Sequence, residues 1–368
     1  MFVSHRINLR SILCRLRLLI WSTVAMMVLG AATAHAARTP ELLVDVAPSS
    51  TEFQDRVIDD AGGRLTARAS QSPRYRPYRL FTGGAVRVAV SSRYAETPGL
   101  AESYVEFLET LPHGDELSDL SVAIGTPQEV SSACGGGAAT LACYVTRSET
   151  MYVPGEQRTT GGGVTTSYVV AHEYGHHVAN NRSNAPFAAI AFGPKYWSSR
   201  EQVCSRVLEG RLSPGNQGDE YALNPGESWA EVYARLRYPN ARWQFTPLLR
   251  PDSAALAAAR RDVSDPWTKP KRVTFRGRLG GSGIRRSFRL NLTLDGELNF
   301  KLRGPARAQY DMRVSSNGKV IDTTSRDGSG DSLRYPTACR DRATQKLKVT
   351  ILRRSGAGAF RLDVNYAG

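Results

Sequence analysis

The sequence predicts an α+β fold, in which a region of mixed helices and strands is followed by an all-β sandwich. Helix-like and strand-like patterns alternate from residue 85 to about residue 265. After Lys271 the pattern changes to short alternating segments separated by Gly, Asn and Asp, which is typical of a sandwich. The 368 residues are enough for about two domains, and we place the boundary near residue 268.

The N-terminus predicts export. Residues 1–17 carry four arginines and no acid, and a largely apolar run follows from Leu18 to Leu29. Ala34-His35-Ala36 has the small residues of a cleavage site, so residues 1–36 are expected to be a signal peptide. The alternative is a membrane anchor, but the run is shorter than the ~20 residues that a span needs. We therefore expect a secreted, periplasmic or cell-envelope protein with no membrane span after signal cleavage.

Three further segments follow the signal peptide. Residues 37–79 contain clusters of Pro and Ser, and we expect a linker or pro-segment there rather than a core. The mixed domain is expected at residues 80–268, and the sandwich at residues 269–368.

Periodicity defines the elements of the mixed domain. Strands are predicted where apolar and polar residues alternate, at residues 85–91, 120–124, 143–146 and 151–153, with the last two forming a hairpin. Helices are predicted where apolar residues recur every three or four positions, namely after Thr97-Pro98, from about Ser167 to Asn180, at 200–211, at 226–237, and within 239–271.

The net charge of +14 does not identify a partner. A basic chain can bind nucleic acid, an anionic envelope or an acidic substrate. Here the charge is scattered along the chain. Of the 48 basic residues, 41 are Arg, and this preference for Arg over Lys is typical of the base composition of a genome rather than of a binding site. We therefore expect no nucleic-acid role.

Four cysteines remain after the signal peptide: Cys134, Cys143, Cys204 and Cys339. An even number in an exported chain favours disulfides. Cys134 and Cys143 flank a short glycine-rich stretch, so we pair them, which leaves Cys204 to pair with Cys339 between the domains. A zinc cluster is the alternative, but the sequence has no C-x-x-C pair.

The strongest chemical signal is His172-Glu173-Tyr174-Gly175-His176, an H-E-x-x-H pattern within a predicted helix. Residues four apart lie on one helical face, so the two imidazoles can share one Zn²⁺ ion. Glu173 is then placed to take a proton from zinc-bound water. The alternative is a coincidental pair of histidines on a helix surface.

A third zinc ligand must be an acid, because no histidine follows His177. In the predicted helix at 226–237, Glu227 and Glu231 share a face. Glu227 is the expected ligand, and Glu231 is expected to accept a hydrogen bond from a ligand histidine. The alternatives are a solvated acidic helix face, or another acid such as Glu220 as the ligand.

Three other side chains were considered. Tyr221 is a candidate donor to the oxyanion of peptide hydrolysis, or else a packed aromatic residue. His177 points to another helical face and is expected to be structural. His113 is expected on the surface.

These motifs resemble a known group of enzymes. H-E-x-x-H followed by Glu227-x-x-x-Glu231 is similar to the gluzincin metallopeptidases, and residues 168–178 also resemble the bacterial putative neutral zinc metallopeptidases. The resemblance covers about residues 85–240 and implies a zincin-like catalytic domain. In such enzymes an edge strand pairs with extended substrate, and Met151–Val153 is the candidate, or else an ordinary sheet strand. Two features depart from the pattern: the segment between the motifs matches poorly, and Glu231 stands where Asp is usual.

The C-terminal region weakly resembles the pre-peptidase C-terminal domain of secreted bacterial peptidases, through Gly356–Leu362 and the strand that follows. The expected function is therefore a secreted zinc endopeptidase that acts on protein or peptide substrates. The alternatives are an aminopeptidase, or a non-catalytic envelope-binding protein that keeps zinc for its structure.

Overall fold

The computed structural model describes residues 40–58, 75–77, 86–94, 97–135, 140–157, 163–324, 330–340 and 345–368. The expected signal peptide lies outside these residues, as does much of the segment 59–85. Within the described ranges, no helix is both long and apolar enough to cross a membrane.

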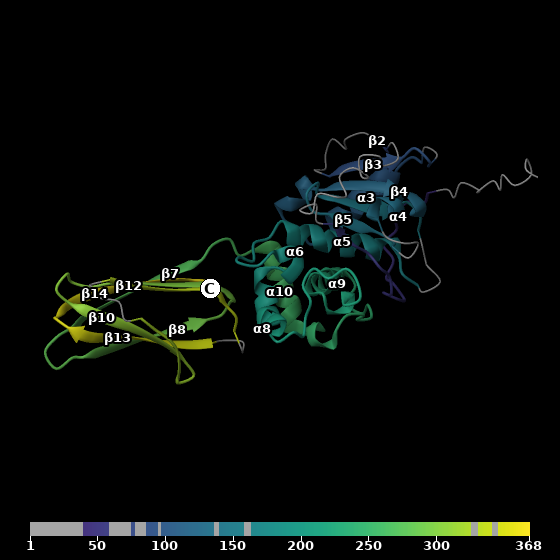
Figure 1. The fold of residues 1–368 in the computed structure, drawn as a ribbon. Coiled ribbons are helices and arrows are strands. Elements are labelled where there is room, and N and C mark those ends of the chain that lie inside the picture. Colours follow the sequence, from purple (N-terminus) through teal and green to yellow (C-terminus); the bar gives the residue numbers. More distant parts are fainter. Residues whose placement is uncertain are drawn as a thin grey trace, which may run out of the picture. The chain divides into compact units, whose positions relative to one another are not determined.

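A six-stranded mixed sheet forms the first part of the described chain (Figure 1). Its strand order is β1-β5-β6-β4-β3-β2. The bounds are β1 Val57–Ile58, β2 Tyr75–Pro77, β3 Arg87–Ser91, β4 Ser121–Gly125, β5 Cys143–Val145 and β6 Thr150–Pro154. Strands β3, β4 and β6 run parallel, whereas β5 is antiparallel to β6. The predicted hairpin is thus confirmed.

The prediction of an edge strand at Met151–Val153 is wrong. Residues Met151–Val153 lie in β6, which pairs with β4 on one side and with β5 on the other. The hairpin turn brings β5 onto the flank that was expected to be free. Strand β5 is therefore next to the edge, and its outer side pairs with the two residues of β1.

Helices fill the rest of this region (Figure 1). Their bounds are α3 Leu100–Thr110, α4 Pro127–Cys134, α5 Thr166–Asn180, α6 Ala189–Phe192, α7 Lys195–Arg200, α8 Val203–Leu208, α9 Pro225–Arg237 and α10 Ser253–Ser264, with short 3-10 turns at Asp115–Asp119, Tyr221–Leu223 and Pro247–Leu249. The predicted helices after Thr97-Pro98, at 167–180 and at 226–237 are confirmed. The helix predicted at 200–211 is shorter, and the alanine-rich helix is α10.

One hydrophobic core joins the sheet and these helices. It runs from Leu43 to Val263 and includes Phe53. Residues 40–58 belong to the segment that was expected to be a linker or pro-segment outside any core. Leu43 and Phe53 of these residues nevertheless pack into this core.

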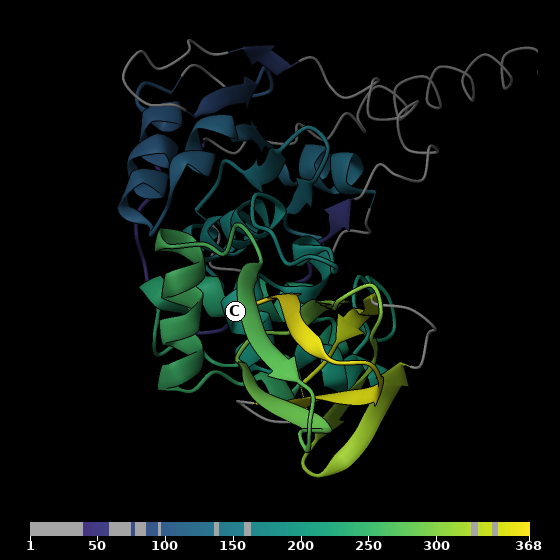
Figure 2. The ribbon, with the colours of Figure 1, turned by 90° about the vertical axis from the view of Figure 1, so that its left-hand side faces the viewer.

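The C-terminal residues form two four-stranded antiparallel sheets, seen as green-to-yellow arrows in Figure 1 and Figure 2. Their orders are β11-β10-β13-β8 and β12-β9-β14-β7. The bounds are β7 Lys271–Leu279, β8 Arg285–Leu292, β9 Gly296–Arg303, β10 Gln309–Ser316, β11 Lys319–Thr324, β12 Gly330–Ala338, β13 Gln345–Ser355 and β14 Gly358–Tyr366. Alternate residues such as Leu298, Phe300 and Leu302 face a core that is separate from the first. The chain thus mixes α and β structure, consistent with the predicted class.

Both predicted disulfides are present. Cys134, at the end of α4, bonds to Cys143 at the start of β5. Cys204 in α8 bonds to Cys339, which directly follows β12. The second bond links a helix of the first region to the C-terminal sheets.

Candidate metal centre

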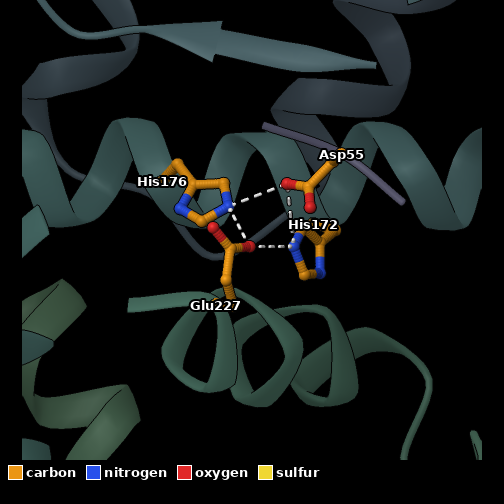
Figure 3. A group of neighbouring side chains, drawn as sticks. All are labelled: Asp55, His172, His176 and Glu227. Atoms are coloured by element: carbon orange, nitrogen blue, oxygen red, sulfur yellow. Dashed lines mark hydrogen bonds and ion pairs between the residues drawn. The ribbon is translucent and has the colours of Figure 1, made fainter. Parts of the chain in front are cut away.

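Four side chains that can bind a metal meet in the interior of the first region: Asp55, His172, His176 and Glu227 (Figure 3). Their ligand atoms all lie within 4.8 Å of one another, and all four residues are buried. The two histidines come from α5, Glu227 comes from the first turn of α9, and Asp55 lies just before β1. The sequence analysis predicted three of these four residues.

The contacts converge on two imidazole nitrogens. Glu227 Oε2 lies 3.1 Å from His176 Nε2 and 3.5 Å from His172 Nε2. Asp55 Oδ2 lies 3.1 Å and 3.3 Å from the same two atoms. Two imidazole nitrogens and carboxylate oxygens are a donor set that suits Zn²⁺.

The close packing of α5 against α9 depends on Gly175. A Cβ atom on this residue would lie 2.9 Å from Ala230 Cα and 3.0 Å from Tyr233 Cβ. Such contacts are too short for any larger side chain. The carbonyl of Gly175 also accepts a hydrogen bond from Trp229 Nε1 at 2.9 Å. Glycine at this position therefore lets α9 bring Glu227 to the histidines.

Local caps set where the two helices begin. The Thr165 side chain accepts a hydrogen bond from Tyr168 N at the start of α5. Asn224 caps α9 by accepting from Gly226 N at 3.0 Å, and Pro225 occupies the first helical position. Asn224 is therefore the N-cap of α9, and the helix begins one residue earlier than the predicted 226.

Asp55 was missed because no spacing motif relates it to the H-E-x-x-H helix, 121 residues from His176. It belongs to the segment that we expected to be a linker or pro-segment. The sequence signal that could have drawn attention to it is the apolar pair Val57-Ile58 and the neighbouring Phe53, which are unusual in a solvated linker.

Glu173 is fully buried beside the cluster. Neither of its carboxylate oxygens has a hydrogen-bond partner among the described residues. Burial, together with the nearby Asp55 carboxylate, holds the pKa of Glu173 well above its ordinary value. A buried, unpaired carboxyl group is costly, and such groups concentrate where chemistry or ligand binding requires them.

The pKa values of the two imidazoles are raised, whereas burial alone would lower them. Burial would lower the pKa of His176, but Glu227 and Asp55 raise it to about 9. Burial would likewise lower the pKa of His172, but Asp55, Glu227 and Glu231 hold it well above its ordinary value. A divalent cation at the cluster would lower both pKa values again, because metal ligation requires neutral imidazoles.

Glu231 and Tyr221 also lie at the cluster. Glu231 Oε2 is 3.5 Å from His172 Nδ1, the ring nitrogen that does not face Glu227, but the two atoms do not form the expected hydrogen bond. The Tyr221 hydroxyl donates to Asp55 Oδ1 and is 3.4 Å from Glu227 Oε2. Gln217, which no sequence motif indicated, donates from its Nε2 to Glu227 Oε1 at 2.6 Å.

His177 and His113 lie outside the cluster, as predicted. The His177 ring is buried between two partners: its Nε2 is 2.7 Å from the carbonyl of Glu116, and its Nδ1 is 3.0 Å from the Tyr144 hydroxyl. Because a carbonyl can only accept, Nε2 carries the proton and Nδ1 accepts from the tyrosine. His113 is exposed.

No protein-family model and no curated protein matches the sequence. Among solved structures, the pre-peptidase C-terminal domain of a Bacillus anthracis collagenase matches with 12% identity over 25% of this chain and 87% of its own, at a TM-score of 0.22. The Yersinia pseudotuberculosis-derived mitogen matches with 18% identity over 27% of this chain and 87% of its own, at a TM-score of 0.22. Likenesses at these TM-scores carry no conclusion about this chain.

Proposed function

We propose that this chain is a secreted zinc-dependent endopeptidase. The observation that carries the proposal is the convergence of His172, His176 and Glu227 beside Glu173. Three protein ligands and an adjacent carboxyl group are what a hydrolytic zinc site requires. The two disulfides support an oxidising location outside the cytosol.

The residues have distinct roles in this proposal. His172, His176 and Glu227 would hold the zinc ion, which would lower the pKa of a coordinated water and polarise a carbonyl group. Glu173 takes a proton from the water that attacks the peptide carbonyl and passes this proton to the leaving amine. Glu231 orients His172 through the ring nitrogen that does not bind metal.

Tyr221 is proposed to donate to the oxyanion. Burial and the neighbouring Asp55 and Glu227 carboxylates hold the pKa of Tyr221 well above its ordinary value. The hydroxyl therefore keeps its proton and can act as a donor. An extended substrate would pair with the outer side of β5 in place of β1, since β6 has partners on both sides.

A second function is favoured by one observation. Asp55 brings the number of possible ligands to four, and structural zinc sites have four protein ligands and no open position. A non-catalytic protein that keeps zinc for its structure is therefore the rival proposal. An aminopeptidase remains the other enzymatic alternative, and internal cuts in a peptide library would exclude a strict aminopeptidase.

Hydrolysis of casein distinguishes the two proposals. Because the Asp55 carboxylate lies against both histidines, the comparison is made between Asp55→Ala and the double variant Asp55→Ala/Glu173→Gln, both loaded with zinc. Loss of the general base should lower the rate by about 100- to 10,000-fold while the zinc content stays the same. Equal hydrolysis by the two variants would contradict the assigned role of Glu173. No hydrolysis by either would favour the structural zinc site.

A further inference from the structure

We propose that residues 53–58 hold the chain in a latent form: Asp55 closes the metal site, and the residues around it fill the path of an extended substrate. This inference rests on the proposed function. It assigns to a segment of the chain itself a regulatory role that the catalytic proposal does not require.

The first support is the position of the Asp55 carboxylate. Its Oδ2 faces the same two Nε2 atoms as Glu227 Oε2, at 3.1 and 3.3 Å. A catalytic zinc site has three protein ligands and leaves the fourth position to water or substrate, whereas a fourth protein ligand closes it. Asp55 is therefore placed to occupy the position that a reacting water would need (Figure 3).

The second support is the backbone of the same segment. The amides of β5 and its flanks donate to residues 54–58: Leu141 N to Gln54 O at 3.0 Å, Tyr144 N to Arg56 O at 3.0 Å, and Thr146 N to Ile58 O at 3.1 Å. Extended peptides bind proteins by adding a strand to an exposed sheet edge in this way. The chain's own residues thus take up the hydrogen bonds that β5 would offer a substrate.

The third support is the contact made by Phe53. Its ring packs edge-on against His172, with 5.1 Å between the ring centroids, and against Tyr168 at 6.3 Å. Phe53 also lines a cavity of about 480 Å³ together with Leu141, Tyr221 and Phe245. An apolar side chain placed beside a catalytic metal and a pocket resembles the way a substrate side chain would be held.

The fourth support is the unpaired carboxyl group of Glu173. Glu173 is buried beside the cluster without a hydrogen-bond partner among the described residues. In a permanently closed structural site this carboxyl group would destabilise the fold without forming any interaction. If Asp55 withdraws and a water takes its place, Glu173 acquires a partner. The arrangement therefore fits a site that opens.

The test is ligand access to the metal in the full mature chain, loaded with Co²⁺, whose visible spectrum reports its coordination. Acetohydroxamate is titrated against the wild type, Asp55→Ala, Asp55→Asn and Glu52→Ala. Glu52→Ala is the matched control, since Glu52 is an exposed acid three residues away. Asp55→Asn keeps the size of the side chain and an acceptor for Tyr221.

If the closed form holds about 99% of the wild-type chains, removing Asp55 should tighten acetohydroxamate binding by about 100-fold. Both Asp55 variants should keep one metal per chain, and Glu52→Ala should behave as the wild type. Equal binding by the wild type and Asp55→Ala would overturn the proposal, as would loss of the metal in both Asp55 variants. Casein hydrolysis separates the two proposals: an open metal without hydrolysis contradicts the endopeptidase but leaves the closure by Asp55 standing.

Discussion

Buried carboxylates have different neighbours in the two regions of the chain. In the sandwich, Asp363 is only 3% exposed and accepts a hydrogen bond from Thr274 at 2.6 Å. Arg361 lies 2.9 Å from one of its oxygens, and Arg272 and Arg303 lie 3.4 and 3.7 Å from the other. Cations of the same sheet thus neutralise this acid.

In the first region, no arginine or lysine among the described residues forms an ion pair with an acid of the metal cluster. Among the described residues, the ion-pair partners of Asp55 and Glu227 are His172 and His176, and Glu173 has none. Burying carboxylates without a permanent cation is strongly unfavourable. The sandwich thus neutralises Asp363 with its own arginines, and this contrast supports the proposal that the cluster of the first region binds a cation.

The largest expected effect is that of metal removal on the first region. Ligand that is present at 1,000 times its dissociation constant stabilises a protein by about 4 kcal/mol, so EDTA should destabilise this region by about that amount. Tryptophan fluorescence reports mainly on this region, because residues 271–368 contain no tryptophan and, of the tryptophans in the described hydrophobic clusters, only Trp267 packs against them, at Leu294 and Ala367. The unfolding of the sandwich, followed by hydrogen exchange of the amides of residues 271–368, should shift much less. Equal shifts of both signals, or none, would contradict the comparison.

The second effect concerns the ligand from α9. A structural zinc site contributes about 10–16 kcal/mol in total, so one of three or four ligands is worth about 3 kcal/mol. Glu227→Ala should therefore weaken zinc binding by more than about 100-fold, measured by competition with a chromogenic chelator. Glu231→Ala should lose about 10- to 100-fold.

Glu220→Ala is the control for this measurement. Glu220 is exposed, and its carboxylate accepts hydrogen bonds from Ser213 and Asn216 instead of facing the histidines. Zinc affinity should not change. If Glu220→Ala lost zinc while Glu227→Ala kept it, the assignment of the third ligand would be wrong.

The smallest expected effect is in the sandwich. Burial would raise the pKa of Asp363, but Thr274, Arg361 and Arg272 lower it to about 2. A depressed folded pKa gives stability that is present above about pH 4 and is lost as the pH falls towards 2. Asp363→Asn should therefore cost about 1–2 kcal/mol at pH 7 and flatten this dependence, as measured by urea unfolding at several pH values. An unchanged acid profile would show that the arginines do not stabilise Asp363.

Much of the fold could be predicted from the sequence because local patterns decide it. The helix at 166–180 has its cap and apolar spacing within one stretch, and the alternation in β9 reflects its two faces. The interior position of β6 could not be predicted, since strand order depends on contacts between distant segments. Its neighbour β4 lies about 30 residues earlier in the chain.

The residues of the site also differ in whether local sequence patterns predict them. His172 and His176 are related by one helical turn, and Glu227 was found because an acid had to replace the missing third histidine. Asp55 obeys no such rule. Its place at the cluster comes from the pairing of β1 with β5 and from the packing of Phe53, neither of which leaves a periodic signal.

X-ray absorption at the zinc edge of the full mature chain tests the central claim most directly. The account predicts one zinc per chain, bound by two imidazole nitrogens and by carboxylate oxygens, with no sulfur. His172→Ala and His176→Ala should each weaken the imidazole signature, leaving one ring, or remove the metal itself. Sulfur in the coordination shell, or a zinc environment unchanged by both substitutions, would contradict the account.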